Sequence, residues 1–595
     1  MTVALPTTLC EAFQRTAARM PDAVALRTPG DTTRITWGEY ARRVEQIAAG
    51  LANLGVAPGD AVALMLTNRP EFHLVDTAAM HLGAVPFSIY NTNPVETIAY
   101  QLAKTGSRVI VCEKQFLPQI AAARAVDRTV DTVVVVDEGG ADTVSLAELE
   151  SNPLPGFDFR AAWERVGAED VLTIIFTSGT TGTPKGVELT HANILSNIDG
   201  VRDMLDPWFE HRTVSYLPDA HIVNRWTCHY FPMIGGGPVT DLADPKQIVT
   251  ALSDTRPTAF VGVPQVWYKI KGALEAQLAA ETSPVKRTLA TWAIDIGRQQ
   301  VRAELGGSGG GVSPWLAARH RVADRLVLHK IRHRLGLDEL LVGATGAAPI
   351  APEALEFVLG LGLPVGEVYG MSELSAIATL NRPGRMRLGT VGVAARGVEV
   401  SLAEDGEILV RGPIVMKGYL GDPEQTAEAI DADGWVHTGD IGTVDADGFV
   451  SIVDRKKELI VNSGGKNMSP SKIEGYVKVA CPLAGSVVAI GDARPYITAL
   501  IALDPDAAAA YALAHGLTPN PAELATDPGI REIIDAGIRD ANMKLARVEQ
   551  IKKFVVAPVF WQPGGDELTP TGKLKRKPIT AKYATEIDTM YSATR

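Results

Sequence analysis

Cysteine is scarce in this chain of 595 residues, which has only four. Cys10, Cys112, Cys228 and Cys481 lie far apart and form no C-x-x-C pair. The sequence therefore indicates neither a zinc-binding motif nor a disulfide framework. Such usage is typical of a reducing compartment, so we expect a cytoplasmic protein.

Long apolar runs are also missing, because no stretch reaches the ~18 uninterrupted apolar residues that a membrane-spanning helix needs. The N-terminus lacks the basic-then-apolar pattern of a signal peptide. Positive charge is in deficit as well: 57 Lys and Arg face 69 Asp and Glu, which gives a net charge of −12. This balance argues against general nucleic-acid binding.

The overall composition, with 46% hydrophobic and 21% charged residues, is that of an ordinary globular protein. Single cores rarely grow past about 250–300 residues, so the length implies several structural units. Residues 30–150 alternate helical patterns with apolar β-branched runs at 61–66, 108–112 and 132–136. Strands separated by helices predict an α/β fold with a parallel sheet covered by helices.

The most informative stretch is the Gly-, Ser- and Thr-rich string at 177–186, directly after an apolar run at 171–176 that predicts a buried strand. Its glycines allow a tight turn, and successive N–H groups in such a turn bind anions. Pro184 stands where a P-loop needs glycine, which argues against an ordinary kinase or GTPase. The alternative is a polar surface turn. The polyphosphate contacts that we predict come from Thr177, Ser178, Gly179, Thr180, Thr181, Gly182 and Lys185.

This string closely resembles the phosphate loop of the adenylate-forming (ANL) superfamily, which includes acyl-CoA synthetases, luciferases and peptide-synthetase adenylation domains. The resemblance extends over six ordered motifs, from about residue 10 to residue 590. It implies a large N-terminal domain, residues 1–453, of parallel and mixed sheets with helices and a β-barrel-like part. A hinge at 454–457 and a small, mobile α+β domain at 458–595 would follow.

By the same resemblance, a loop of small residues at 346–348 packs on adenine and Tyr369 stacks on the base. Glu373, with Thr177, would hold Mg²⁺, which prefers oxygen ligands. The family usually has threonine where Ser372 stands, and the hydroxyl is kept. The nucleotide contacts that the resemblance implies are Gly346, Ala347, Ala348, Tyr369, Gly370, Met371, Ser372, Asp440 and Arg455.

Residues 434–440 read as a turn that presents Asp440, and a carboxylate can accept hydrogen bonds from both ribose hydroxyls. The resemblance places Arg455 on ribose or phosphate and makes Lys457 the hinge residue that absorbs a domain rotation. It also assigns the channel for the CoA thiol to a loop that contains Ser463, Gly464 and Gly465.

Lys573 lies in a basic C-terminal stretch, and the plain interpretation is a solvated basic patch. The resemblance instead makes it the catalytic lysine, and it implies that Lys185 and Glu373 are the other catalytic residues. A compact ammonium suits charge neutralisation between an attacking carboxylate and the α-phosphate.

The acyl pocket is less well defined. By resemblance, His221 lines it, although a hydrogen-bonded loop histidine is the alternative, and Trp226 is either a gate or part of the core. Residues 256–267 resemble long-chain fatty acyl-CoA synthetases, and 268–340 predicts a long helical region broken by a Gly/Ser linker at 306–311. By resemblance, long-chain members of the family carry a helical insertion of this size here, which supports a long apolar substrate. The alternative is an ordinary helical segment that does not contact the substrate.

The sequence thus predicts an AMP-forming ligase that activates a medium- or long-chain fatty acid with ATP and Mg²⁺ and transfers it to CoA. The rivals are a fatty acyl-AMP ligase that loads a carrier protein, whose extra insertion is missing between 350 and 388, and a catalytically silent binding protein. A homodimer and peripheral contact with the inner face of the membrane are further expectations, because a fatty substrate partitions into lipid.

Overall fold

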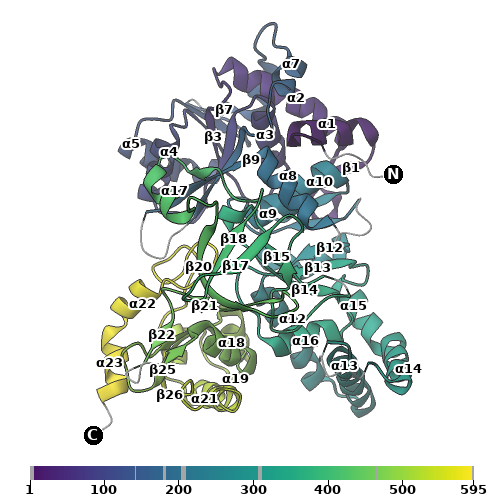
Figure 1. Ribbon diagram of the computed structural model, residues 1–595, viewed down its shortest axis with the longest axis vertical. Helices are drawn as coiled ribbons and strands as arrows, with labels where there is room; N and C mark the ends of the chain where they lie inside the picture. Colours follow the sequence, from purple (N-terminus) through teal and green to yellow (C-terminus); the bar gives the residue numbers. More distant parts are fainter. Residues whose placement is uncertain are drawn as a thin grey trace.

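A computed structural model describes residues 6–140, 142–177, 183–202, 210–305, 311–382, 384–462 and 466–592. The N-terminal part lies at the top of the view, and the C-terminal part lies at the lower left (Figure 1). Ser178–Gly182 of the predicted phosphate loop and Ser463–Gly465 of the predicted CoA channel fall outside these ranges.

The first sheet is parallel throughout, as the alternation of helices and strands predicts. Its helix α2 (Trp37–Asn53) begins at Thr36, whose hydroxyl accepts a hydrogen bond from the N–H of Glu39. Helix α3 (Pro70–His81) is buried at every position except Glu71. The strands, in spatial order, are β4 (Val85–Ser88), β3 (Ala61–Met65), β5 (Val109–Cys112), β6 (Thr132–Val135) and β7 (Val144–Ser145).

The strand expected before the phosphate loop is β8 (Val171–Thr177), which is buried along most of its length. It pairs antiparallel with β9 (Lys185–Thr190), so the loop joins the two strands of a hairpin. A short strand far along the chain, β19 (Gly418–Tyr419), completes this sheet beside β9. Thr190 then caps helix α8 (His191–Gly200), as predicted.

A second five-stranded sheet carries the predicted adenine loop. Its first three strands are parallel and its last two are antiparallel. A four-stranded sheet, β10 (Thr213–Ser215), β11 (Val239–Asp241), β1 (Val24–Arg27) and β2 (Arg34–Thr36), also belongs to the large domain. The five strands are β12 (Ala259–Val261), β13 (Val342–Thr345), β14 (Val365–Tyr369), β15 (Thr379–Leu380) and β16 (Val393–Ala394).

The predicted helical region between 268 and 340 is confirmed. It packs on the second sheet through one apolar core that includes Phe260, Trp267 and Leu328. Helix α13 approaches α16 (Pro352–Gly360) so closely that a Cβ at Gly297 would lie 1.9 Å from the carbonyl oxygen of Gly360. The helices are α12 (Pro264–Ala280), α13 (Pro284–Leu305), α14 (Pro314–Ala323), η6 (Asp324–Leu328) and α15 (His329–Leu335).

Asp440 lies within a strand, and the prediction that a turn presents it was wrong. The turn ends at Gly434, and Asp440 is the fifth residue of β20 (Val436–Val444). Alternate residues of that strand are buried, so Thr438 and Asp440 face inward with Val436. The sheet is antiparallel and also contains β17 (Glu399–Leu402), β18 (Glu407–Arg411) and β21 (Val450–Arg455).

Beyond residue 457 the chain forms its own apolar core around β24 (Ala484–Ile490) and β25 (Ile497–Leu503), the hairpin that the sequence predicts. Strand β26 (Ile551–Val556) runs parallel to β25. The helices are α18 (Pro470–Ala480), α19 (Pro505–His515), α20 (Pro521–Leu524), α21 (Pro528–Asn542), α22 (Arg576–Lys582) and α23 (Ala584–Ser592). Among the described residues, no helix is both long and apolar enough to cross a membrane.

Candidate active site

Three of the predicted nucleotide-binding residues lie together. Tyr369 ends β14, and Asp440 of β20 pairs with Arg455 at the end of β21. The hydroxyl of Tyr369 donates to Oδ2 of Asp440 at 2.7 Å, and Nε of Arg455 lies 2.8 Å from Oδ1 of the same carboxylate. The antiparallel register sets Asp440 opposite Arg455, which explains the ion pair. Burial raises the pKa of Asp440, while Arg455 and Tyr369 oppose this shift by stabilising the charged form.

The predicted adenine loop follows β13 and presents backbone with little side chain. A Cβ at Gly346 would lie 2.9 Å from the carbonyl oxygen of Val368, so only glycine fits there without a shift of the backbone. Ala347 has a positive φ of 67°, and both Ala347 and Ala348 are exposed. Gly370 is equally constrained, since its Cβ would lie 1.8 Å from the carbonyl oxygen of Ala376.

Glu373 lies in the short helix η7 (Ser372–Leu374), which follows Met371. Tyr419, a residue that the sequence analysis missed, links Glu373 to Lys185. The hydroxyl of Tyr419 donates to Oε1 of Glu373 at 3.0 Å, and Nζ of Lys185 lies 4.5 Å from the centre of the Tyr419 ring. Thr177 pairs with Lys185 across the hairpin. No local motif marks Tyr419, because only the pairing of β19 with β9 brings it here.

Lys573 reaches this cluster from the C-terminal domain. Its N–H donates to the Thr569 hydroxyl at 3.0 Å in a tight turn closed by Gly572, whose φ is +77°. Burial and the neighbouring Arg455 lower the pKa of Lys573, while Asp440 and Glu373 act in the opposite direction. Lys573 is nevertheless exposed to solvent. We call the space between Lys573 and the large-domain residues Asp440, Arg455 and Glu373 the cleft.

His221 also lies close enough to Lys573 to interact electrostatically. Burial, with a smaller contribution from Lys573, lowers the pKa of His221 to about 4, so its ring is neutral at pH 7. Its Nδ1 accepts a hydrogen bond of 3.2 Å from the N–H of Val223 and caps α9 (Ile222–Asn224). Trp226, in η4 (Arg225–Tyr230), is only 5% exposed and stacks on Phe231, which is the packing of a core residue.

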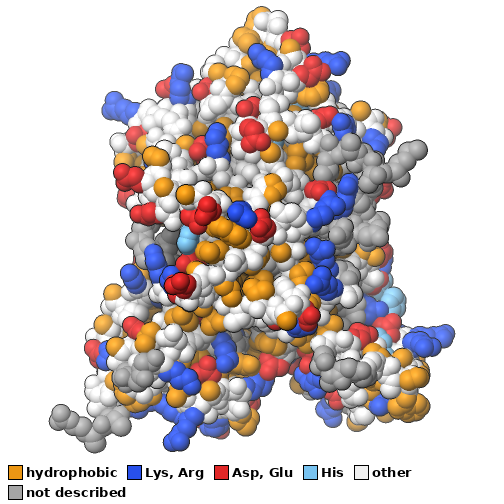
Figure 2. All heavy atoms as spheres, in the orientation of Figure 1, with side chains coloured by type: hydrophobic (Ala, Val, Ile, Leu, Met, Phe, Trp, Pro, Cys, Tyr) orange, Lys and Arg blue, Asp and Glu red, His pale blue; other side chains and the backbone are white. Residues whose placement is uncertain are grey.

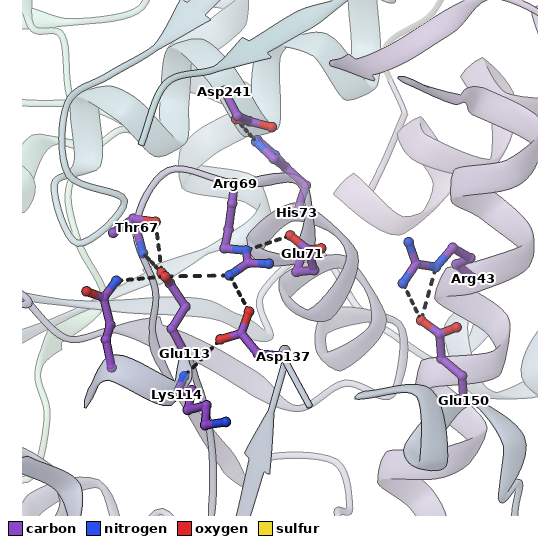
Figure 3. A network of polar contacts seen from close by, with 11 residues as sticks. Arg43, Thr67, Arg69, Glu71, His73, Glu113, Lys114, Asp137, Glu150 and Asp241 are labelled. Carbon is purple, nitrogen blue, oxygen red and sulfur yellow. Dashed lines mark hydrogen bonds and ion pairs between the residues drawn. The ribbon is translucent and has the colours of Figure 1, made fainter. Parts of the chain in front are cut away.

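The sequence analysis missed a fully buried network of charged groups that contacts the loop carrying His221. Nε2 of His73 lies 2.9 Å from Oδ1 of Asp241, a contact drawn in Figure 3. Its Nδ1 lies 2.9 Å from Nδ1 of His229. Nε2 of His229 lies 2.9 Å from Oδ1 of Asp76, whose Oδ2 is 2.5 Å from Nη1 of Arg225.

These contacts fix the number of protons on the two histidines. An ionised carboxylate only accepts hydrogen bonds, so both Nε2 atoms must carry hydrogen. The contact between the two Nδ1 atoms needs one more proton, which gives the pair of His73 and His229 a single positive charge. Burial lowers the pKa of His73 but is outweighed by Asp241, so its pKa is raised, whereas burial lowers the pKa of His229 to about 4. Of the two rings, that of His73 therefore holds a proton more readily.

The network anchors the loop that carries His221. Nε of Arg225 donates to the carbonyl oxygen of Asp219 at 2.9 Å, and the Asn224 amide donates to Oδ1 of Asp219 at 2.6 Å. A buried arginine with satisfied donors holds its partners in one geometry. Residues of α3, β11 and η4 therefore set the position of His221.

The sequence as a whole matches a known family. The family model for AMP-binding enzymes matches residues 13–420, and the model for the AMP-binding enzyme C-terminal domain matches residues 457–595. The chain belongs to the AMP-binding enzyme family. It is thus a member of the adenylate-forming superfamily that its motifs resemble.

Relatives of this AMP-binding enzyme carry ligase names. It is 49% identical to the Mycobacterium tuberculosis protein named fatty-acid–CoA ligase fadD11, over 76% of this chain and 79% of that one. It is 34% identical to the long-chain-fatty-acid–CoA ligase FadD15 of Mycobacterium bovis, over 95% and 93%. The chicken long-chain-fatty-acid–CoA ligase ACSBG2 is 31% identical, over 99% and 81%.

Solved structures share the fold of this AMP-binding enzyme at low sequence identity. The adenylation domain of a carboxylate reductase from Mycobacterium chelonae superposes with a TM-score of 0.75 at 19% identity, covering 98% of this chain and 91% of that one. The anthranilate CoA ligase AuaEII, in complex with anthranoyl-AMP, gives 0.72 at 18% identity, covering 97% and 98%. The mixed α/β architecture with a separate C-terminal domain is therefore that of adenylating enzymes.

Proposed function

We propose that this enzyme joins a fatty acid to ATP to form acyl-AMP and pyrophosphate, and then transfers the acyl group to CoA. A carboxylate oxygen attacks the α-phosphorus as pyrophosphate leaves, and the CoA sulfur then attacks the carbonyl carbon as AMP leaves. The observation that carries the proposal is the meeting of Lys573, from the C-terminal domain, with Asp440, Arg455 and Glu373 of the large domain. The names of the relatives point to the same reaction.

In this proposal each part of the cleft has one task. The open backbone at 346–348, with Tyr369, receives adenine, and Asp440 with Arg455 receives the ribose. Lys185 and the 177–182 loop hold the β- and γ-phosphates, and Ser372 adds a hydroxyl. Lys573 neutralises the carboxylate as it approaches the α-phosphate, so that positioning and charge stabilisation supply the rate, as in phosphoryl transfer generally.

Mg²⁺ fits the donors at Glu373. Among the described residues, no group of three or more His, Cys, Asp or Glu side chains could hold a metal ion by itself. Mg²⁺ characteristically binds one or two carboxylates together with substrate phosphates, and Glu373 with the Thr177 hydroxyl offers such a set. When bound, the ion would neutralise phosphate charge.

For the second step we propose a rotation about Lys457 that withdraws Lys573 and brings the 463–465 loop to the carbonyl carbon. This divides the chain into residues 1–453, a hinge at 454–457 and a mobile domain at 458–595. Hinge motions of this kind are concentrated at a few residues that absorb the change in backbone angles. The exposed Lys457, in a turn after β21, is suited to this role.

We propose a medium- or long-chain fatty acid as substrate, with His221 and Trp226 on the acyl side of the cleft. A neutral His221 can face an acyl carboxyl without adding charge. We also propose a cytoplasmic location and a homodimer. Peripheral contact with a membrane completes the proposal, because a fatty acid of this length partitions into lipid.

The test is pyrophosphate release with ATP and Mg²⁺ over saturated fatty acids of graded length, with and without CoA. Turnover that requires CoA and peaks at one chain length is expected. A single burst that CoA does not convert to turnover would favour the acyl-AMP ligase that loads a carrier protein. Release with none of the fatty acids, although ATP binds, would favour the silent binding protein.

A further inference from the structure

The helical region of the large domain has a charge opposite to that of the whole molecule. Between residues 284 and 335 there are ten Lys or Arg and three Asp or Glu, a net charge of +7 in a chain whose net charge is −12. In Figure 2 blue, pale-blue and orange side chains gather at the lower right, where Figure 1 places α14 and the neighbouring α13.

One face of the continuous helix α14–η6–α15 combines this charge with exposed apolar side chains. Trp315 is 72% exposed, Val322 51% and Leu326 45%. Arg321, Arg325 and Lys330 are exposed beside them at helical spacing. We call these six residues the arm face. Next to it, the start of α13 exposes Val285 and Leu289.

The cations of the arm face are available to a partner. Among the described residues, no ion pair involves Arg321, Arg325 or Lys330. By contrast, Arg332, on the inner side of the same helix, pairs with Asp324 at 2.7 Å. The opposite side of the helix is held by Ala323 and Leu328, which are fully buried in the core shared with β12 and α12.

We infer that the arm face docks this enzyme on an anionic lipid bilayer. Amphipathic helices that lie in the bilayer interface combine Trp and Leu with flanking Lys and Arg, and their affinity comes from apolar insertion together with attraction to anionic lipid. The arm face is basic although the molecule as a whole has a net charge of −12, so an anionic surface attracts this face while the average charge of the molecule opposes binding.

The inference does not depend on the reaction proposed above, because vesicle binding is measured without ATP or fatty acid. Co-sedimentation of the full chain with phosphatidylglycerol–phosphatidylcholine vesicles is compared with pure phosphatidylcholine vesicles. Binding at least about tenfold tighter to the anionic vesicles is expected, with loss of that preference at high salt. Equal binding to both kinds of vesicle, or none to either, would overturn the inference.

Two double variants locate the surface. R321E/R325E is expected to weaken binding to the anionic vesicles by about tenfold or more. Its matched control is R124E/R128E, on and just after α5 (Leu117–Val126), which makes the same change in net charge and should have little effect. Equal losses in the two variants would mean that net charge alone governs binding.

W315A/L326A removes two exposed apolar side chains and should also weaken binding, whereas L513A/M543A, at 86% and 79% exposed positions of the C-terminal domain, should not. Sedimentation equilibrium of the same proteins tests whether a second copy of the chain, and not a bilayer, covers the arm face. If W315A/L326A converted a dimer to a monomer and left vesicle binding intact, the arm face would be a contact between two copies of the chain.

Discussion

At the scale of single residues, the cleft depends on charges held close together in a partly desolvated place. Lys573 is the clearest case, because its pKa is lowered by burial and by Arg455 while two carboxylates oppose the shift. Burial and Arg455 thus disfavour the charged ammonium, and the two carboxylates offset part of this effect. The phosphates of ATP and an incoming carboxylate would add further negative charge that stabilises the ammonium.

Lys573→Ala is expected to slow acyl-AMP formation by roughly two to three orders of magnitude, the usual cost of removing one transition-state donor. Thioester formation from supplied acyl-AMP and CoA should remain close to wild type, since we propose that the lysine is withdrawn in that step. The two half-reactions are measured separately by pyrophosphate release and by thioester formation. Equal loss in both would contradict the assignment, and Lys577→Ala, in the same basic stretch, is the control.

Glu367 offers a test of stability at the same scale. This side chain in β14 is buried, and burial raises its pKa to about 8. A carboxyl whose folded pKa is raised contributes fully below the unfolded pKa of about 4.5, and that contribution is lost as the pH rises through about 8.

Glu367→Gln should therefore gain stability relative to wild type as the pH rises, by a few kcal/mol at pH 9 and by less at pH 6. Urea midpoints at the two pH values measure the difference. Glu404→Gln, at an exposed position, should show no such trend. A Glu367→Gln difference that did not grow with pH would mean that this carboxyl is not desolvated in the folded protein.

At the scale of elements, helix α3 and strand β11 hold the loop that carries His221 through buried charges, on the side where we propose that the acyl group lies. Arg69, at the N-terminal end of α3, also bonds to Glu71 and Asp137, which ties the helix to the segment that follows β6 of the first sheet (Figure 3). Buried ion pairs add little net stability, but breaking one leaves an unpaired charge. The network therefore fixes geometry more than it stabilises the fold.

Asp76→Asn should destabilise the protein by about 3–5 kcal/mol, because Arg225 and the charged histidine pair lose a buried counterion. It should also raise the KM for fatty acid while the KM for ATP changes little, since Arg225 anchors the loop that carries His221. Urea unfolding and initial rates measure the two effects. Glu164→Gln, in an exposed pair with Arg160, should cost less than about 1 kcal/mol. Unchanged stability would mean that Asp76 is not a buried anion.

At the scale of the whole molecule, two of the ion pairs that join the two domains are easily exchanged. Lys269 pairs with Asp506 at 3.1 Å and Lys544 with Glu353 at 3.2 Å; three of these side chains are exposed and Glu353 is partly exposed. Exposed pairs contribute about 0–1 kcal/mol each. A rotation of the C-terminal domain therefore meets little resistance from these two contacts.

Lys457→Pro should block the second half-reaction and spare the first, the reverse of Lys573→Ala. Proline fixes φ at the proposed hinge, and the structure already has Lys573 in the cleft for acyl-AMP formation. Single-turnover pyrophosphate release should persist while thioester formation falls by about tenfold or more. Loss of the first step instead would mean that the substitution distorts the cleft, and normal thioester formation would exclude rotation at this residue.

The sequence alone determined the elements and the family. Apolar runs and caps predict β3, β5, β6 and β8, the 268–340 helices and the hairpin of β24 and β25, because local periodicity reports which side of an element is buried. The ordered motifs around Thr177, Tyr369, Asp440 and Lys573 also identify adenylate chemistry. These motifs are local strings in which a few neighbouring residues carry the signal.

Only the tertiary structure decided what lies beside those motifs. Tyr419 joins Lys185 to Glu373 through a pairing of β19 with β9 that spans more than two hundred residues of sequence. The pair of His73 and His229 likewise depends on packing between elements that lie far apart in the sequence. Such contacts leave no periodic pattern in the chain, because their partners are brought together by the packing of sheets and helices and not by spacing along one element.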